Sequence, residues 1–354
     1  MMQHLEFEQG RRIIAISDIH GDLSSLQSLL TKVNYSEYND YLIIMGDMIE
    51  KGRENLDTIH YLMTLKSRNE KVFILKGNCD RILENVMDND NNIPETLKYL
   101  SFNKNSIFHE MAESVGTSIE TAEDLKYVLT YLKDEKEFID SLPTALISEE
   151  FVFVHAGIRD LDNENDSKYH LTARNYYNSG IDLGKYVVVG HYPVCNYSQK
   201  LISNNPIIDL DKKIISIDGG NRVKVGGQLN ALIIEKVNDA YTFTYRSVAN
   251  YERRLFKPFR AGNENNCRIV MWPNLEVSMQ ERKEITSIII NHRNELMEVR
   301  NEFLKQDDKG KWFFTSDYTD HYFTLTAPKL GYVIYENDEE VLACIDGIQG
   351  WIKK

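Results

Sequence analysis

The sequence predicts an α/β fold with a parallel sheet, a second sheet, a helical insertion and a small α+β unit in the C-terminal region. Three observations support this prediction. Strand-like apolar runs alternate with helix-like segments from residue 11, polar helix-forming sequence fills residues 88–146, and strand-like runs then resume. With 354 residues, 42% of them apolar and 27% charged, the chain has the material for about two ordinary globular domains.

The first part of the chain has a strand, helix, strand, helix, strand order. Strands are expected at 11–17, 40–46 and 71–77, and helices at 23–33 and 55–68. This order is typical of parallel strands joined by right-handed crossovers. The strand runs are almost continuously apolar, which indicates that both faces of the sheet are covered.

The pattern then changes to an insertion or cap of helices, followed by more strands. Helices are expected at 94–102, 106–115 and 122–142. Among the strands that follow, the last ones alternate between apolar and polar residues, which favours antiparallel pairing. These strands are expected at 149–157, 185–191, 213–220, 229–237 and 241–248. A second sheet is therefore predicted.

The C-terminal region is separated by a linker expected at 262–266. Beyond it, the pattern at 278–304 predicts a helix, and aromatic runs at 311–325 and 329–337 predict short strands. The role of this α+β unit is left open. The predicted domains are a main domain, residues 1–261, and the small unit, residues 265–354.

Charge and composition exclude several classes of protein. The formal net charge of −13 argues against extended contact with nucleic acid, which needs a positive surface. No run approaches the roughly 20 apolar residues of a membrane span, and the start MMQHLEFEQGRR lacks the apolar core of a signal peptide. The four cysteines form no CxxC or CxxH pattern, so reduced thiols are expected. We therefore expect a cytoplasmic protein without membrane contact, and the oligomeric state is left open.

Five short blocks of polar residues and glycine each follow an apolar run. DIHGD begins at Asp18, GDMIEKG at Gly46, GNCD at Gly77, HAG at His155 and GHYP at Gly190. Strand ends are where an α/β sheet presents side chains to a ligand. The blocks offer six oxygen or nitrogen ligands for two metal ions, namely Asp18, His20, Asp47, Asn78, His155 and His191.

The ligand types suggest the chemistry. The Asp47 carboxylate has two oxygens and can bridge two cations, and imidazoles combined with carboxylates suit manganese, iron or zinc. Two such ions about 3.5 to 4 Å apart bind a bridging water, lower its pKa and clamp a phosphoryl oxygen. Taken alone, Asp18 or Asp47 can cap the following helix, and a single histidine can be a buried structural residue. Five blocks in order favour the metal centre.

These blocks resemble those of the calcineurin-like metallophosphoesterases, above all the phosphoprotein phosphatases and their bacterial and phage relatives, including diadenosine tetraphosphatases. That family shows GDxHG, GDxxDRG, GNHE, HGG or HAG, and GH. The similarity runs from about Ile13 to Val248, and it includes FIDSLP and IDGGNRVKVGGQLNAL. The resemblance implies a two-sheet β-sandwich flanked by helices, and hydrolysis of phosphate esters by a hydroxide that bridges two divalent or trivalent metal ions. Manganese is expected, with iron, zinc or nickel as alternatives.

The resemblance also implies roles for individual residues. Asp47 would bridge the two metals. The other ligands would be Asp18 and His20 on one metal, and Asn78, His155 and His191 on the other. Arg174 falls where the family carries an arginine that binds the substrate phosphate, and its guanidinium can hold two phosphate oxygens. A surface arginine in a charged loop is the alternative.

Two blocks depart from the pattern of the family. Glu50 and Lys51 replace the second Asp and the Arg of GDxxDRG, so a phosphate contact would pass to Lys51 or to nearby Arg53. In GNCD, Cys79 stands where the family has the histidine that protonates the leaving oxygen, and Asp80 replaces the glutamate. The candidate catalytic residues are therefore Asp47, Asn78, Cys79 and Asp80.

The loss of this histidine bears on the substrate. General acid catalysis contributes about 10² to 10⁴ in rate, so its loss matters most for poor leaving groups such as that of a phosphoprotein. A phosphodiesterase, or a hydrolase of nucleotides or dinucleotide polyphosphates, is the alternative to a phosphatase of phosphoproteins or small phosphorylated molecules. The Cys79 thiol can serve as a weak acid or simply pack. A binding or regulatory module with little turnover is the second alternative, supported by the altered blocks and the unassigned C-terminal unit.

Overall fold

The computed structural model describes residues 1–260 and 266–354. Its chain forms two compact units. Unit 1 contains Met1–Pro193, Pro206–Val223 and Leu229–Val248, and unit 2 contains Val194–Asn205, Lys224–Gln228 and Ala249–Lys354. The sequence places a single boundary between residues 261 and 265. The linker predicted at 262–266 lies outside the described residues, apart from Asn266.

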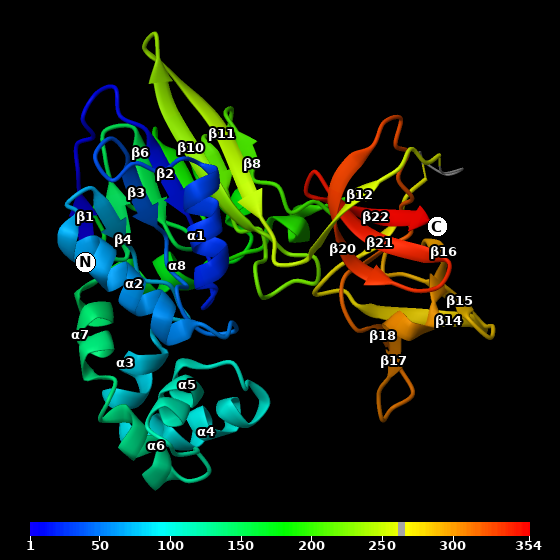
Figure 1. The fold of residues 1–354 in the computed structure, drawn as a ribbon, viewed down its shortest axis with the longest axis horizontal. Helices are drawn as coiled ribbons and strands as arrows, with labels where there is room; N and C mark the ends of the chain where they lie inside the picture. The colour runs from blue at the N-terminus through cyan, green and yellow to red at the C-terminus, as the bar shows by residue number, and fades with distance from the viewer. Residues whose placement is uncertain (261–265) are drawn as a thin grey trace. The chain divides into compact units, whose positions relative to one another are not determined.

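Unit 1 is built around two sheets, seen in Figure 1. The first sheet contains β2 (Ile13–Ile16), β3 (Tyr41–Ile44), β4 (Val72–Ile74), β10 (Leu229–Val237) and β11 (Ala240–Val248), in the order β11-β10-β2-β3-β4. The second contains β1 (Met2–His4), β5 (Ala145–Ile147), β6 (Phe151–Val154), β7 (Tyr186–Val189), β8 (Ile207–Asp209) and β9 (Ile214–Ser216), in the order β1-β5-β6-β7-β9-β8. As predicted, β2, β3 and β4 are parallel, and β10 pairs with β11 in antiparallel fashion.

The two sheets pack face to face because their strands are apolar on both faces. Successive side chains of a strand point to opposite faces. In β2, Ile13 and Ala15 join a core shared with Phe153 of β6 and Val188 of β7, whereas Ile14 packs in a second core formed with the helices. This arrangement confirms the predicted two-sheet sandwich with helices outside it.

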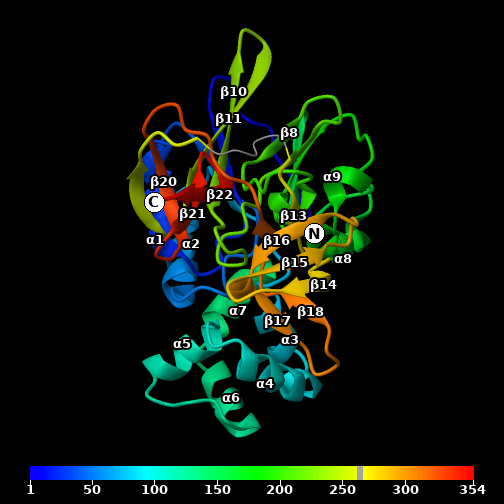
Figure 2. The same cartoon turned by 90° about the vertical axis from the view of Figure 1, so that its right-hand side faces the viewer.

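Helices cover the outer faces of the sandwich. α1 (Leu23–Lys32) and α2 (Asn55–Arg68) lie on one side, and α8 (Ser167–Thr172) and α9 (Tyr176–Ser179) on the other, as Figure 2 shows. α1 begins where predicted because the Asp22 side chain accepts the backbone N–H of Ser25 as an N-cap. Among the described residues, no helix has both the length and the apolar character needed to cross a membrane.

Further helices gather at one end of unit 1 (Figure 1) and form the predicted helical segment. The segment 122–142, predicted as one helix, is divided into two, because Thr130 and Tyr131 form a turn. The helices are α3 (Ile82–Met87), α4 (Ile93–Phe102), α5 (Ile107–Ser114), α6 (Ala122–Leu129) and α7 (Lys133–Ser141). Their apolar faces extend the core of the first sheet through Leu83, Phe108 and Leu125.

The described part of unit 2 is made of β-strands and short helical turns. One sheet contains β12 (Glu252–Phe256), β20 (Lys329–Glu336), β21 (Glu340–Ile345) and β22 (Ile348–Lys353). A second has the order β16-β15-β14-β18-β17, with β14 (Glu276–Arg282), β15 (Thr286–Ile290), β16 (Leu296–Arg300), β17 (Leu304–Gln306) and β18 (Trp312–Phe314). A small pair joins β13 (Ile269–Val270) to β19 (Tyr318–Thr319).

The helix predicted at 278–304 was wrong, and with it the α+β character of the C-terminal unit. The segment forms most of β14 and all of β15 and β16, which pair as an antiparallel meander. Burial follows a period of two: Ser287 and Ile289 are buried on β15, and Met297 and Val299 on β16. The many charged residues imitate a helix pattern, but they occupy the solvent face of the strands and the turns between them.

Candidate metal centre

The six predicted ligands come together where strands of both sheets end. In the first sheet, Asp18 and His20 follow β2, Asp47 follows β3, and Asn78 follows β4. In the second sheet, His155 follows β6 and His191 follows β7. Since neighbouring strands within each group are parallel, their carboxyl ends meet at the same edge.

Four ligand positions have a left-handed backbone, with φ of 57° at Asp18, 53° at His20, 51° at Asp47 and 64° at His191. Residues other than glycine rarely adopt this conformation, which costs about 1–3 kcal/mol each and is concentrated at functional sites. The chain is also tightly packed here, since a Cβ at Gly190 would lie 2.4 Å from Asp18 Oδ2. The surrounding fold therefore fixes the directions of these side chains.

His155 is held with one ring nitrogen facing the centre. Its Nδ1 lies 2.9 Å from the carbonyl oxygen of Met45, and a carbonyl only accepts, so Nδ1 carries the proton. Nε2 then has a free lone pair, 3.4 Å from Asp47 Oδ1 and 3.0 Å from the amide of Asn78. Imidazoles that bind metals are usually fixed in this way by a second partner.

Asp47 lies between two groups of ligands. Its Oδ2 is 3.8 Å from His20 Nε2, and its Oδ1 is 3.4 Å from His155 Nε2. Two sets of side chains each bring ligand atoms within 4.8 Å of one another: His20, Asp47 and Cys79, and Asp47, His155 and His191. Asp47 is the member that the two sets share.

Asp18 lies in a crowded acidic environment. Its side chain accepts the backbone N–H of His191 at 2.9 Å and the hydroxyl of Ser17. Burial and the nearby carboxylates of Asp218 and Asp47 raise the pKa of Asp18 well above its usual value. Asp218 follows β9. It was not singled out from the sequence, although its place after a strand, in the IDGG run, could have indicated that it lies near the other carboxylates.

The centre suits divalent cations. Burial lowers the pKa of His20 and lowers that of His191 to about 4, so both rings are neutral, the form that binds metal. His20 Nδ1 is buried without a hydrogen-bond partner among the described residues. Several buried carboxylates at close range are costly unless a cation balances them. The donors therefore fit the metal ions implied by the sequence.

Cys79 lies at the edge of the centre. Its backbone N–H donates to Asp47 Oδ1 at 2.8 Å, and its Sγ is 3.5 Å from the amide nitrogen of Asn78. Burial and the charge of Asp47 raise the pKa of the Cys79 thiol well above its usual value. The sulfur therefore stays protonated near neutral pH.

Asp80 is fully buried beneath the ligand loops. Its two carboxylate oxygens accept the backbone N–H groups of Gly77 at 2.7 Å, Met48 at 2.8 Å, Asp47 at 2.9 Å and Ile49 at 3.4 Å. The sequence grouped Asp80 with the catalytic residues, but its oxygens are directed at the backbone. Its contacts are those of a residue that positions Asp47.

Glu50 and Lys51 connect the GDMIEKG loop to the helical segment. The Glu50 carboxylate is buried and accepts hydrogen bonds from Tyr99 Oη at 2.7 Å, Ser106 Oγ at 2.8 Å and the backbone N–H of Ile107 at 3.0 Å. Lys51 Nζ lies 3.4 Å from Tyr99 Oη. Burial lowers the pKa of His20, and the positive charge of Lys51 lowers it further, so the Lys51 ammonium group is near the centre.

The two arginines predicted to bind phosphate differ in position. Burial is the main cause of the lowered pKa of His191, and the positive charge of Arg174 lowers it further. Arg174 is therefore close to this candidate ligand. Arg53 is exposed and makes no hydrogen bond or ion pair with any residue in the described parts of the chain. The structure thus brings Arg174 near the ligands and does not bring Arg53 into contact with them.

Carboxylates and neutral imidazoles, buried where strands of two sheets end, are the donors expected of a metal centre in an α/β sandwich. The model of the calcineurin-like phosphoesterase family matches residues 11–214, which include all six ligands. The chain therefore belongs to the calcineurin-like phosphoesterase family. The resemblance inferred from the motifs is confirmed, and divalent metal ions are implied by the family.

Curated relatives match parts of the chain. A bis(5'-nucleosyl)-tetraphosphatase, symmetrical, from Buchnera aphidicola subsp. Acyrthosiphon pisum (strain Tuc7) is 42% identical over 65 residues, 18% of this chain and 23% of that protein. The protein of the same name from Vibrio parahaemolyticus serotype O3:K6 is 27% identical over 146 residues, 40% and 43% of the two chains. Serine/threonine-protein phosphatase 2 of Salmonella typhimurium is 44% identical over 54 residues, 15% and 25%. The chain spans less than half the length of these relatives.

Among solved structures, a protein serine/threonine phosphatase from Saccharomyces cerevisiae is similar, with a TM-score of 0.45 and 12% identity over 71% of this chain and 84% of that chain.

Proposed function

We propose that this protein is a metal-dependent hydrolase of phosphate esters, with two metal ions bridged by Asp47. The observation that carries the proposal is the Asp47 carboxylate, whose oxygens face His20 Nε2 at 3.8 Å and His155 Nε2 at 3.4 Å. The remaining ligands would be Asp18 and His20 on one ion, and Asn78, His155 and His191 on the other.

The side chains of unit 1 would share the chemistry. When bound, two such ions lower the pKa of a water molecule and polarise a phosphoryl oxygen. Arg174 and Lys51 would stabilise the negative charge that develops on the phosphoryl oxygens. Asp80 would act indirectly, by holding the Asp47 loop through three of its backbone N–H groups. Since all these residues lie in unit 1, we assign catalysis to that unit and leave the role of unit 2 open.

Manganese is the metal that we propose, with iron, zinc or nickel as alternatives. Carboxylate, amide and imidazole donors suit manganese and iron as well as zinc. Elemental analysis of protein purified without added metal would identify the ions bound.

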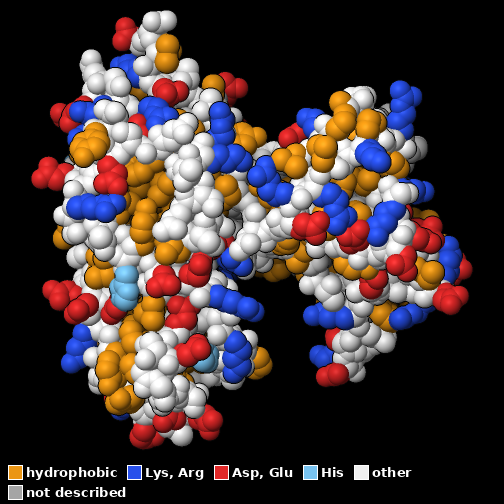
Figure 3. Space-filling view, in the orientation of Figure 1, with side chains coloured by type: hydrophobic (Ala, Val, Ile, Leu, Met, Phe, Trp, Pro, Cys, Tyr) orange, Lys and Arg blue, Asp and Glu red, His pale blue; other side chains and the backbone are white. Residues whose placement is uncertain are grey.

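The substrate that we propose is a phosphorylated small molecule or nucleotide, with a phosphoprotein or a phosphodiester as alternatives. The relatives are named as tetraphosphatases and as a protein phosphatase. Because position 79 has no imidazole to protonate the leaving group, substrates whose leaving group is already a stable anion are favoured. The phosphates of a polyphosphate chain are such leaving groups. Asp and Glu side chains are spread among Lys and Arg on the face seen in Figure 3, and the net charge is −13, which disfavours extended nucleic acid.

Hydrolysis of p-nitrophenyl phosphate and bis(p-nitrophenyl) phosphate in the presence of manganese would test the proposed reaction. Asp47→Asn should abolish turnover and lower the metal content, whereas Asp57→Asn, at an exposed position of α2, should change neither. A protein that binds metal but hydrolyses neither ester, nor a dinucleotide polyphosphate, would instead be a binding or regulatory module.

We also propose a cytoplasmic location. The four cysteines are thiols in the described structure, and thiols remain reduced in the cytoplasm. Cell fractionation followed by immunoblotting would contradict this location if the protein were recovered with the membranes or the secreted fraction.

A further inference from the structure

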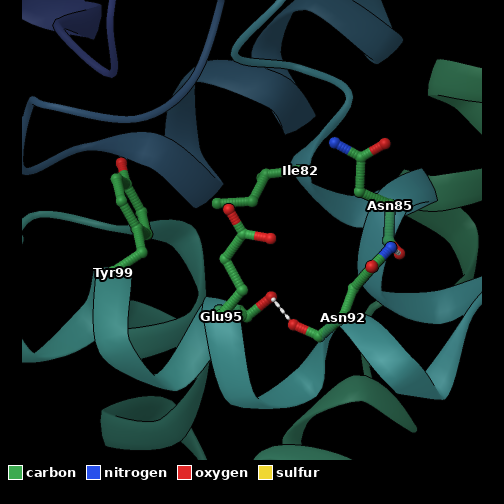
Figure 4. Close-up of a pocket in the computed structure, with 6 residues that line it drawn as sticks. Ile82, Asn85, Asn92, Glu95 and Tyr99 are labelled. Atoms are coloured by element: carbon green, nitrogen blue, oxygen red, sulfur yellow. Dashed lines mark hydrogen bonds between the residues drawn. The ribbon is translucent and has the colours of Figure 1, made fainter.

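A cavity opens among the helices that follow the GNCD loop. It has a volume of about 420 Å³, within the range of about 300–1,000 Å³ that is usual for small-molecule sites. It is lined by Ile82 and Asn85 of α3, by Glu95, Thr96 and Tyr99 of α4, and by Asn92, which directly precedes α4. Figure 4 shows this cavity.

One side chain links this cavity to the metal centre. Tyr99 lines the cavity, and its hydroxyl lies 3.4 Å from Lys51 Nζ and 2.7 Å from Glu50. Ile82 begins α3 only three residues after Cys79. A phosphate held beside Lys51 would therefore have the rest of its ester within reach of the cavity.

The lining combines a flat apolar part with polar groups. The Tyr99 ring and the Ile82 side chain supply apolar surface. Asn85 and Glu95 are exposed, and their side chains make no hydrogen bond within the described residues. Figure 4 shows the Glu95 carboxylate directed toward Ile82, between Tyr99 and Asn85. Their polar groups are thus available to a ligand.

The polar groups indicate which ligand fits. A carboxylate accepts hydrogen bonds from hydroxyl and amino groups and repels a phosphate, whereas an amide both donates and accepts. A nucleoside offers a planar base for Tyr99 and Ile82, ring atoms for Asn85, and two ribose hydroxyls for Glu95. An anionic group in this cavity would meet Glu95 unfavourably.

We propose that the cavity binds the nucleoside of a nucleotide substrate and so sets the specificity of the enzyme. This inference rests on the proposed function, because it assigns the group attached to the phosphate that is hydrolysed. The leaving nucleotide would occupy the helical segment, and its phosphate would lie near Lys51.

Binding of nucleosides tests the proposal without any turnover. Adenosine and guanosine are titrated into the full-length protein, and shifts in its NMR spectrum are followed. We expect saturable binding of at least one of them, with Kd raised about tenfold by Asn85→Ala or Glu95→Ala, the size expected for one or two lost hydrogen bonds. Glu113→Ala, at an exposed position on α5, is the matched control and should leave Kd unchanged.

Three results would overturn the nucleoside site: no saturable binding of either nucleoside, an equal effect of the Glu113 control, or tighter binding of a phosphoserine peptide that the same variants weaken. In turnover, Glu95→Ala should lower kcat/KM for diadenosine tetraphosphate about tenfold relative to that for p-nitrophenyl phosphate. Turnover of p-nitrophenyl phosphate without nucleoside binding would refute the cavity assignment alone. Nucleoside binding without hydrolysis of any ester would support the cavity and refute the proposed reaction.

Discussion

The Asp80 carboxylate accepts the backbone N–H of Asp47 at 2.9 Å, so the loop after β4 holds the loop after β3. The same carboxylate binds the N–H of Gly77 at 2.7 Å, in its own loop. One buried side chain thus fixes two neighbouring ligand loops.

Replacement of Asp80 by alanine should weaken both folding and metal binding. Buried N–H groups without an acceptor cost about 1–3 kcal/mol each, so we expect the free energy of unfolding to fall by about 3 kcal/mol or more. Urea denaturation and metal titration would measure the two effects. Asp57→Asn serves as the exposed control, and an Asp80→Ala protein with unchanged metal affinity would contradict the positioning role.

The stability of the metal-free protein should depend on pH through Asp80. Burial and the charge of Asp47 raise the pKa of Asp80 from 3.8 to about 7. The folded state then binds more protons than the unfolded state between these values, so the free energy of unfolding decreases as pH rises from about 4 to about 7. Denaturation of chelator-treated protein across this range should show a steeper decrease for the wild type than for Asp80→Asn. Equal slopes would rule out this contribution.

Addition of metal should stabilise the protein more at neutral than at acid pH. Protons compete with the cation for the carboxylates, and burial together with Asp218 and Asp47 raises the pKa of Asp18. The rise in Tm caused by manganese should therefore be larger near pH 7.5 than near pH 5, and a chelator should reverse it. Differential scanning fluorimetry provides the measurement, and a pH-independent rise would speak against carboxylate ligands.

Introduction of histidine at position 79 should broaden the range of substrates. An imidazole there could protonate a poor leaving group, so Cys79→His should raise kcat for a phosphoserine peptide at least tenfold relative to bis(p-nitrophenyl) phosphate. Cys79→Ser removes the thiol without supplying an acid and should give no gain. If both variants behave alike, the missing acid does not explain the specificity.

Removal of the Glu50 charge should loosen the helical segment. Glu50 accepts hydrogen bonds from Ser106 and Ile107 at the start of α5 and from Tyr99 on α4. Glu50→Gln weakens these hydrogen bonds and should lower the free energy of unfolding by about 1–3 kcal/mol. It should also raise KM, because Tyr99, which lies beside Lys51, would be held less firmly. Thermal unfolding and steady-state kinetics would detect both changes, with Glu113→Gln as control.

The resemblance of the motifs predicted the sandwich, and the six candidate ligands could be picked out because each lies within a few residues of the end of a buried strand. Asp18 and Asp47 are fixed to their strands, and the order of the strands brings them to one edge. The roles of Glu50 and Asp80 depend instead on backbone N–H groups of other loops, which no spacing in the sequence indicates. Asp218 approaches Asp18 only after the chain has crossed both sheets.

The C-terminal prediction failed where helix and strand patterns overlap. Between Arg293 and Arg300, charged residues are interspersed with apolar ones, and short stretches satisfy both the helix and the strand period. Three consecutive isoleucines at 288–290 and the turn around Asn291 favour strands, because β-branched side chains pack well in sheets. Burial of Ile289 and Met297 in the core of unit 2 then decides between the two.

The candidate metal ligands follow strands of two different sheets, and this arrangement has a consequence for biosynthesis. Asp18, Asp47 and Asn78 are synthesised well before His155 and His191, the ligands supplied by the second sheet. A nascent chain that has not yet added β6 and β7 lacks two imidazoles of the centre, so it should not be able to assemble a complete metal site. Hydrolysis would begin only after both sheets have folded and packed together. An unfinished chain would therefore not hydrolyse the phosphate esters around it.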